Sequence, residues 1–167
     1  NGAAGTGKTM VAVEKARRHS VQGDSVLFLC FNRMLRDHLN QQYKSGLLKK
    51  DFENVDFMTI SALAYKVAGD MNGLEDLKQW LSDCYDKKEV FGYKHVIVDE
   101  GQDFGLLGVD DSANEDSSYG CQIIDILELV ALGNGGTFYL FCDRNQIVQG
   151  RALTHNFPPV SPTQNAS

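Results

Sequence analysis

Residues 2–9 read Gly2-Ala3-Ala4-Gly5-Thr6-Gly7-Lys8-Thr9, and this stretch decides the fold. It fits the pattern G-x-x-x-x-G-K-S/T at every position, which is typical of a loop that cradles phosphates. Glycines allow successive backbone N–H groups to point at the phosphates, and a helix that begins here adds its positive N-terminal end. We therefore expect this loop to bind ATP, with Lys8 at the β- and γ-phosphates and the Thr9 hydroxyl on Mg²⁺. The alternative is a glycine-rich lead-in to a helix without a ligand, and the helical pattern immediately downstream disfavours it.

A pair of carboxylates follows an apolar run later in the chain. The run Val96-Ile97-Val98 is followed directly by Asp99 and Glu100. A carboxylate at the end of a buried strand beside a phosphate loop can hold Mg²⁺ through water, and its neighbour can orient or deprotonate the attacking water. We expect Asp99 to take the first part and Glu100 the second. Alone, such a run could be a plain strand terminus, but together with residues 2–9 it favours ATP hydrolysis.

Apolar runs alternate with amphipathic segments, which predicts a doubly wound parallel α/β sheet with helices on both faces. Strands are expected at 26–31, 55–59, 96–98 and 138–142, and helices at 8–21, 74–84 and 123–132, with two further helices after Asn32 and Ser61. Residues 104–120 are polar and contain glycine, so we expect a loop or insertion there. Ligands of such sheets collect at the carboxyl ends of the strands, which is where Asp99 and Glu100 fall.

Two polar residues are expected to cap helices. Asn32 is the predicted N-cap of the helix after the first of these strands, with Met34, Leu35 and Leu39 on its inner face. Ser61 is the predicted N-cap of the next helix.

Length and composition fit one globular domain. The chain has 167 residues, 43% of them hydrophobic, and its formal net charge of −6 argues against a surface that binds polyanions throughout. No apolar run approaches the roughly 18 residues that span a bilayer, so we expect a soluble, cytoplasmic protein without a membrane partner. The cysteines are far apart and have no neighbouring histidine cluster, so no zinc site is expected, and the histidines are interpreted as surface or structural residues. We expect an ATPase domain at 1–154 and a loosely structured tail at 155–167.

Taken together, these stretches resemble the UvrD/Rep-like helicases of superfamily 1. Asp99-Glu100-Gly101-Gln102-Asp103 looks like motif II of that family, and Gly5-Thr6-Gly7-Lys8-Thr9 matches its motif I. Leu29-Cys30-Phe31-Asn32-Arg33 is similar to motif Ia, and Thr59-Ile60-Ser61-Ala62-Leu63 is similar to motif Ib. Phe141-Cys142-Asp143-Arg144-Asn145-Gln146 resembles motif III, and the likeness extends to about Ala152.

The resemblance implies a RecA-like motor domain that hydrolyses ATP with Mg²⁺ and moves on single-stranded DNA or RNA when joined to a second RecA-like domain. It implies nucleic-acid contacts from motifs Ia and Ib, namely from Phe31, Asn32, Arg33, Thr59 and Ser61. It also implies that Gln146 senses the γ-phosphate and that Gln102 couples the nucleotide site to the partner domain.

Some features depart from that family. Gly101 replaces the usual alanine, and Gln149 stands where many members place a tyrosine, which weakens any expectation of base stacking there. The second RecA-like domain and its arginine fingers are missing, so we expect the chain alone to bind ATP and to hydrolyse it weakly or not at all. Because a phosphate loop normally follows a buried strand, a loop that begins at Gly2 also suggests a fragment that has lost its first strand.

Two other functions compete with the helicase interpretation. A P-loop regulatory ATPase that switches a protein partner without nucleic acid stays open, because Arg33 and Arg36 could simply form a solvated helix face. A small-molecule kinase is poorly supported, because no arginine-rich lid follows the phosphate loop and Glu100 suits the activation of water.

Overall fold

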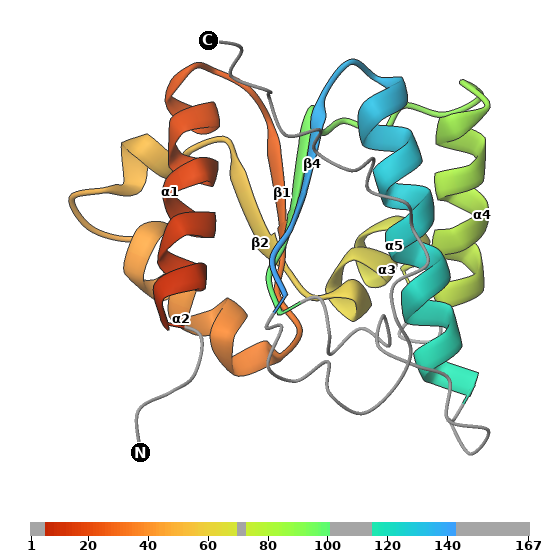
Figure 1. The fold of residues 1–167 in the computed structure, drawn as a ribbon, viewed down its shortest axis with the longest axis horizontal. Coiled ribbons are helices and arrows are strands. Elements are labelled where there is room, and N and C mark those ends of the chain that lie inside the picture. Colours follow the sequence, from red (N-terminus) through yellow and green to blue (C-terminus); the bar gives the residue numbers. More distant parts are fainter. Residues whose placement is uncertain (1–5, 70–72, 101–114, 143–167) are drawn as a thin grey trace, which may run out of the picture.

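The computed structural model describes residues 6–69, 73–100 and 115–142 of the chain, and the side chains of 7–69, 73–100 and 122–142 (Figure 1). Along the sequence the elements are α1 (Thr6–Val21), β1 (Val26–Leu29), α2 (Arg33–Tyr43), the 3-10 helix η1 (Lys49–Phe52), β2 (Val55–Met58), α3 (Ile60–Ala68), α4 (Leu74–Tyr85), β3 (His95–Val98), α5 (Glu115–Gly133) and β4 (Thr137–Leu140).

The four strands form one sheet in the order β2-β1-β3-β4, and every neighbouring pair is parallel. Leu29 at the end of β1 is in register with Met58 of β2 and Val98 of β3. The carboxyl ends of the strands therefore meet at one edge of the sheet, as the alternating pattern predicts.

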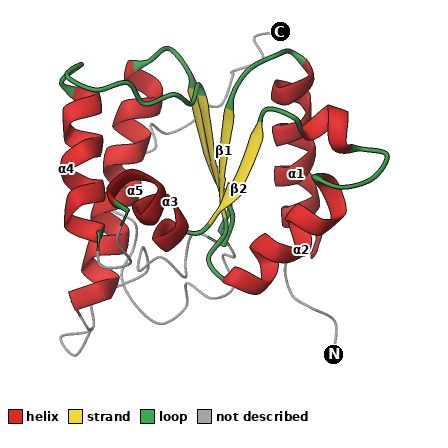
Figure 2. Ribbon diagram, turned by 180° about the vertical axis from the view of Figure 1, so that it is seen from behind, coloured by secondary structure: helices red, strands yellow, loops and turns green. Residues whose placement is uncertain are grey.

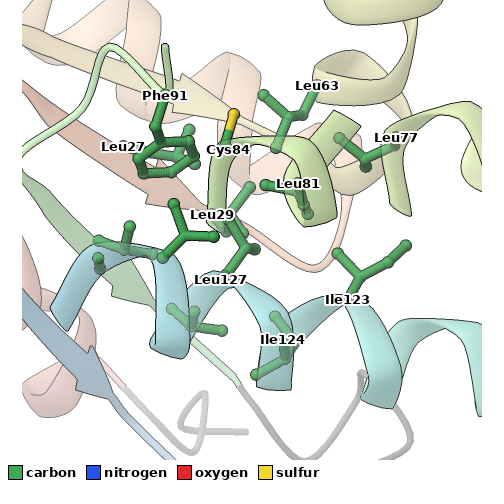
Figure 3. Close-up of a cluster of buried hydrophobic side chains, with 14 of the residues drawn as sticks. Leu27, Leu29, Leu63, Leu77, Leu81, Cys84, Phe91, Ile123, Ile124 and Leu127 are labelled. Carbon is green, nitrogen blue, oxygen red and sulfur yellow. The ribbon is translucent and has the colours of Figure 1, made fainter. Parts of the chain in front are cut away.

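Helices cover both faces of the sheet, so the predicted doubly wound α/β class is confirmed, and it is the architecture of RecA-like domains. Figures 1 and 2 show α1 and α2 on one side of the strands and α3, α4 and α5 on the other. Strand β1 serves both sides because successive side chains point to opposite faces. Leu27 and Leu29 join the cluster under α3, α4 and α5, which Figure 3 shows in close-up, whereas Phe28 joins the cluster under α1 and α2.

The two predicted caps have different outcomes. Asn32 caps α2 as expected, and its Oδ1 accepts a hydrogen bond of 2.8 Å from the Leu35 N–H. The prediction of Ser61 as a cap is wrong, because α3 begins at Ile60 and its N-cap is Thr59. Thr59 has extended backbone angles and its hydroxyl accepts from the Ala62 N–H at 3.1 Å, which leaves Ser61 within the first turn.

Met34 does not lie on the inner face of α2. Its side chain is 84% exposed, whereas Leu39 and Tyr43 are buried and Leu35 packs against the core. Residues 35, 39 and 43 follow one another at intervals of four and form a single stripe. Met34 precedes this stripe by one residue and therefore points away from it.

Helix α5 is longer than predicted. Residues 104–120 were expected to form a loop, but α5 already begins at Glu115, and residues 104–114 lie outside the described part. The apolar half of the helix, with Ile123 and Leu127 buried, holds it on the sheet.

Among the described residues, the longest helices lack the continuous apolar stretch that a membrane-spanning segment requires.

Candidate nucleotide-binding site

The first turns of α1 and the end of β3 meet at the carboxyl edge of the sheet. The Thr9 hydroxyl donates a hydrogen bond of 2.6 Å to Oδ2 of Asp99, although the two residues lie 90 positions apart in the sequence. Asp99 directly follows β3 and is only 1% exposed. The parallel register carries Asp99 to this edge, and α1 begins at the same edge (Figure 1).

Lys8 lies at the same edge. Its ammonium group donates a hydrogen bond of 3.0 Å to the carbonyl oxygen of Cys142, which lies just beyond the end of β4. The charge of Lys8 also acts on the carboxyl group of Asp99. Lys8 and Thr9 thus lie in the same region of the molecule as the carboxylate that follows β3, as the expected nucleotide site requires.

Asp99 is held in surroundings that disfavour its negative charge. Burial raises the pKa of its carboxyl group, and the adjacent Glu100 carboxylate acts in the same direction. The Thr9 hydroxyl, the Glu100 N–H at 3.1 Å and the charge of Lys8 act in the opposite direction without cancelling that rise. A buried carboxylate of this kind gains from a cation, and carboxylate and hydroxyl oxygens are ligands that Mg²⁺ accepts.

Glu100 has an uncommon backbone conformation. Its φ is +56°, in the left-handed region that favours glycine. Strained residues of this kind cluster at functional sites, because the surrounding structure must hold them there. The turn at Glu100 ends the strand directly after the buried carboxylate of Asp99.

The remaining nucleotide candidates are described only in part. Gly7 lies in the first turn of α1, and of Thr6 only the helical backbone is described. The candidates outside the described residues are Gly2, Ala3, Ala4, Gly5, Gln102 and Gln146.

The candidates for nucleic-acid contact lie at the same edge as Asp99. Phe31, Asn32 and Arg33 follow β1, and Thr59 and Ser61 follow β2. Phe31 is 46% exposed and Arg33 is also exposed. Asn32 and Thr59 use their side-chain oxygens to cap α2 and α3, so these two have a structural part regardless of any ligand.

The sequence interpretation missed a second polar cluster at the opposite, amino-terminal edge of the sheet. His19, Asp24 and His95 come together there, although the histidines were interpreted as surface or structural residues. His19 lies in the last turn of α1 and His95 opens β3. The predicted topology places the end of this helix and the start of this strand at the same edge of the sheet. This was the signal from which the cluster could have been predicted.

Comparison with known proteins identifies a family. Residues 1–156 match a family model described as Schlafen group 3, DNA/RNA helicase domain. No curated protein and no solved structure matches the chain.

Proposed function

The chain belongs to the family of Schlafen group 3 DNA/RNA helicase domains, and on this premise we propose that it is an ATP-binding motor domain that hydrolyses ATP with Mg²⁺ and acts on nucleic acid. The observation that carries the proposal is the 2.6 Å hydrogen bond between Thr9 and Asp99. It joins the helix that follows the phosphate-loop motif to a buried carboxylate at the end of a parallel strand. We assign residues 1–154 to this domain and treat 155–167 as a tail.

Each residue of the site has a defined part in the proposed reaction. The backbone N–H groups of residues 2–9 bind the phosphates, and Lys8 exchanges its bond to the Cys142 carbonyl for oxygens of the β- and γ-phosphates. Thr9 and Asp99 would hold Mg²⁺, which would supply positive charge to the phosphates. Glu100 orients the attacking water and accepts its proton. Gln146 would sense the γ-phosphate and link it to the nucleic-acid site, and Gln102 would couple the hydrolysis site to the partner domain.

The finer assignment within this proposal is a UvrD/Rep-like motor of superfamily 1. It places single-stranded DNA or RNA across the carboxyl edge of the sheet, over Phe31, Asn32, Arg33, Thr59 and Ser61. The exposed ring of Phe31 suits stacking on a base, and Arg33 suits a phosphate. Movement along a strand needs a second RecA-like domain that opens and closes against this one.

Nucleotide binding is tested by titrating a fluorescent ATP analogue into wild type and Lys8→Ala. We expect Lys8→Ala to weaken binding severely, because it removes the charge that neutralises the phosphates. Lys15→Ala is the matched control: Lys15 is on the same helix, but its ammonium group lies 4.1 Å from the Tyr139 ring centre. Equal affinity in wild type and Lys8→Ala would remove the assignment of the loop.

Hydrolysis and nucleic-acid dependence form the second arm of this test. We expect Glu100→Gln to keep nucleotide affinity in this domain and to abolish ATP turnover in the parent protein, because the amide cannot accept the proton of water. Turnover by the parent protein should rise when single-stranded DNA or RNA is added. If single strands leave the rate unchanged while a protein ligand raises it, the regulatory ATPase replaces the helicase interpretation.

A further inference from the structure

Two imidazoles and a carboxylate converge at the amino-terminal edge of the sheet, remote from the nucleotide site. His95 opens β3 and is only 4% exposed, whereas His19 and Asp24 are half-buried. Nε2 of His95 lies 3.1 Å from Oδ2 of Asp24, and the rings of His19 and His95 stack with their centres 3.7 Å apart. One ligand atom from each of the three residues lies within 4.8 Å of the other two.

The orientation of His95 is set by its second nitrogen. Nδ1 lies 2.7 Å from the hydroxyl oxygen of Thr137, the first residue of β4, so the ring cannot rotate without breaking that contact. Histidines that bind metals commonly have their other ring nitrogen held by a neighbouring group in this way. With Nδ1 held by Thr137, the Nε2 of His95 is directed at the carboxylate of Asp24.

The separation of the ligand atoms suits a small divalent ion. Zn²⁺ binds imidazole nitrogen at about 2.0–2.1 Å in a tetrahedron, which places neighbouring ligand atoms about 3.3 Å apart. His95 and Asp24 already have this spacing at 3.1 Å. His19 is half-buried and stacks on His95, so its ring must turn out of the stack to direct a nitrogen at the same ion. A cleft of about 580 Å³, lined in part by His19, Gln22 and Tyr139, opens beside the cluster and provides access for the ion and for water as a fourth ligand.

Two neighbouring lysine side chains lower the affinity that we expect for a metal ion. The ammonium group of Lys94 lies 2.8 Å from Oδ1 of Asp24, and Lys15 carries a second positive charge near His19. Lys94 leaves Oδ2 of Asp24 facing His95, but its charge repels a metal ion. We therefore expect micromolar affinity, weaker than that of a structural zinc site.

We propose that His19, Asp24 and His95 form a binding site for a divalent transition-metal ion, for which Zn²⁺ is the best fit. Two imidazoles and one carboxylate with an open fourth position are a ligand set that Zn²⁺ uses in proteins, and they disfavour Mg²⁺, which prefers oxygen ligands. A bound ion would connect the end of α1, the segment before β1 and the start of β3 at one point.

The test uses Zn²⁺ and Co²⁺ as the chloride salts and metal-free protein without a polyhistidine tag. Calorimetric titration should give one Zn²⁺ per chain, and saturating Zn²⁺ should raise the midpoint of thermal unfolding by about 5 °C. Co²⁺ should give the visible absorption of a tetrahedral site without a thiolate charge-transfer band, which separates this site from binding at cysteine. A folded wild type that takes up neither ion in the micromolar range overturns the proposal.

Variants assign the ligands. His19→Gln and Asp24→Asn keep side-chain size, and each should weaken Zn²⁺ binding at least about tenfold. His38→Gln is the matched control, because it removes an exposed imidazole from α2 and should leave binding unchanged. Circular dichroism establishes that each variant is folded. Equal affinity in wild type and the His19→Gln/Asp24→Asn double variant would show that the ion binds elsewhere, and the proposal would then be wrong.

Discussion

The backbone conformation of Glu100, the residue proposed to activate water, costs free energy. A non-glycine residue in the left-handed region is disfavoured by about 1 kcal/mol, because its Cβ crowds the carbonyl oxygen. Glu100 holds a φ of +56° there. We therefore expect Glu100→Gly to raise the free energy of unfolding by about 1 kcal/mol or less, and to abolish ATP turnover by the domain when it is joined to its second RecA-like domain. Urea unfolding followed by circular dichroism measures the first effect, and phosphate release measures the second.

The matched control for this prediction is Glu100→Gln. It removes the carboxylate but keeps the Cβ, so it should lose turnover and keep the stability of the wild type. If the glycine variant is no more stable than the glutamine variant, the backbone at residue 100 is not strained, and the link between strain and function at this turn is lost.

At the residue scale, a chemical motif on one element was easier to predict than a contact between elements. Lys8, Thr9 and Asp99 could be named from the sequence, because the loop pattern and the end of a buried strand are local features, and the structure brings Thr9 and Asp99 into contact. The stacking of His19 on His95 could not be predicted, since it depends on where the last turn of α1 lies relative to the start of β3.

At the scale of elements, the edge strand β2 is protected by side chains of α2. The carbonyl of Asn54, just before β2, accepts a hydrogen bond from the N–H of Val26 in β1, and the carbonyl of Met58 accepts one from the N–H of Cys30, just after β1. The carbonyl oxygen of Phe57 instead accepts a hydrogen bond of 3.3 Å from Nδ2 of Asn40. Lys44 likewise donates to the carbonyl of Val55 at 2.6 Å. Occupied carbonyls make the edge a poor template for another strand, which is how natural sheets avoid aggregation.

Lys44→Met tests this protection. The substitution keeps the aliphatic part of the side chain but removes the hydrogen bonds to the carbonyls of Phe52, Glu53 and Val55. We expect the free energy of unfolding to fall by about 1–3 kcal/mol, because partly buried carbonyls lose a charged donor. Aggregation on heating, followed by light scattering, should also increase.

Lys50→Met provides the comparison, because Lys50 is an exposed lysine of the neighbouring helix η1. Its stability should stay within about 0.5 kcal/mol of the wild type. If both variants lose the same stability, the effect comes from net charge and not from protection of the edge of β2.

Sequence patterns predicted the existence and type of the elements better than their limits. The apolar run at 26–31 identified β1, which is buried and lies in the middle of the sheet. The polar start of α5 was predicted as a loop, because acidic residues and Gly120 lack apolar periodicity. The apolar half of α5 is anchored on the sheet and lets the helix extend through those residues, which is tertiary stabilisation that a local pattern does not contain.

At the scale of the whole molecule, two cores lie on opposite faces of one sheet and share its central strands. Leu27 and Leu29 of β1 pack under α3, α4 and α5, whereas Phe28 packs under α1 and α2. The nucleotide site combines an element of one face with a strand that both cores share: Thr9 lies on α1, and Asp99 follows β3. Loss of either core should therefore separate the two halves of the site.

Because the two cores share β1 and β3, we predict that they unfold together. The chain has a single tryptophan, Trp80, which packs on the α4 side and reports on that core alone. Phe28→Ala deletes a fully buried ring from the opposite core, which should cost about 3–5 kcal/mol. In urea, the transition of Trp80 fluorescence should shift to lower concentration together with that of far-ultraviolet circular dichroism. Val90→Ala, at a residue 84% exposed, should shift neither. A Trp80 transition that stays in place while the circular dichroism transition splits would show that each face unfolds separately, and shared central strands would then not be enough to couple the two halves of the nucleotide site.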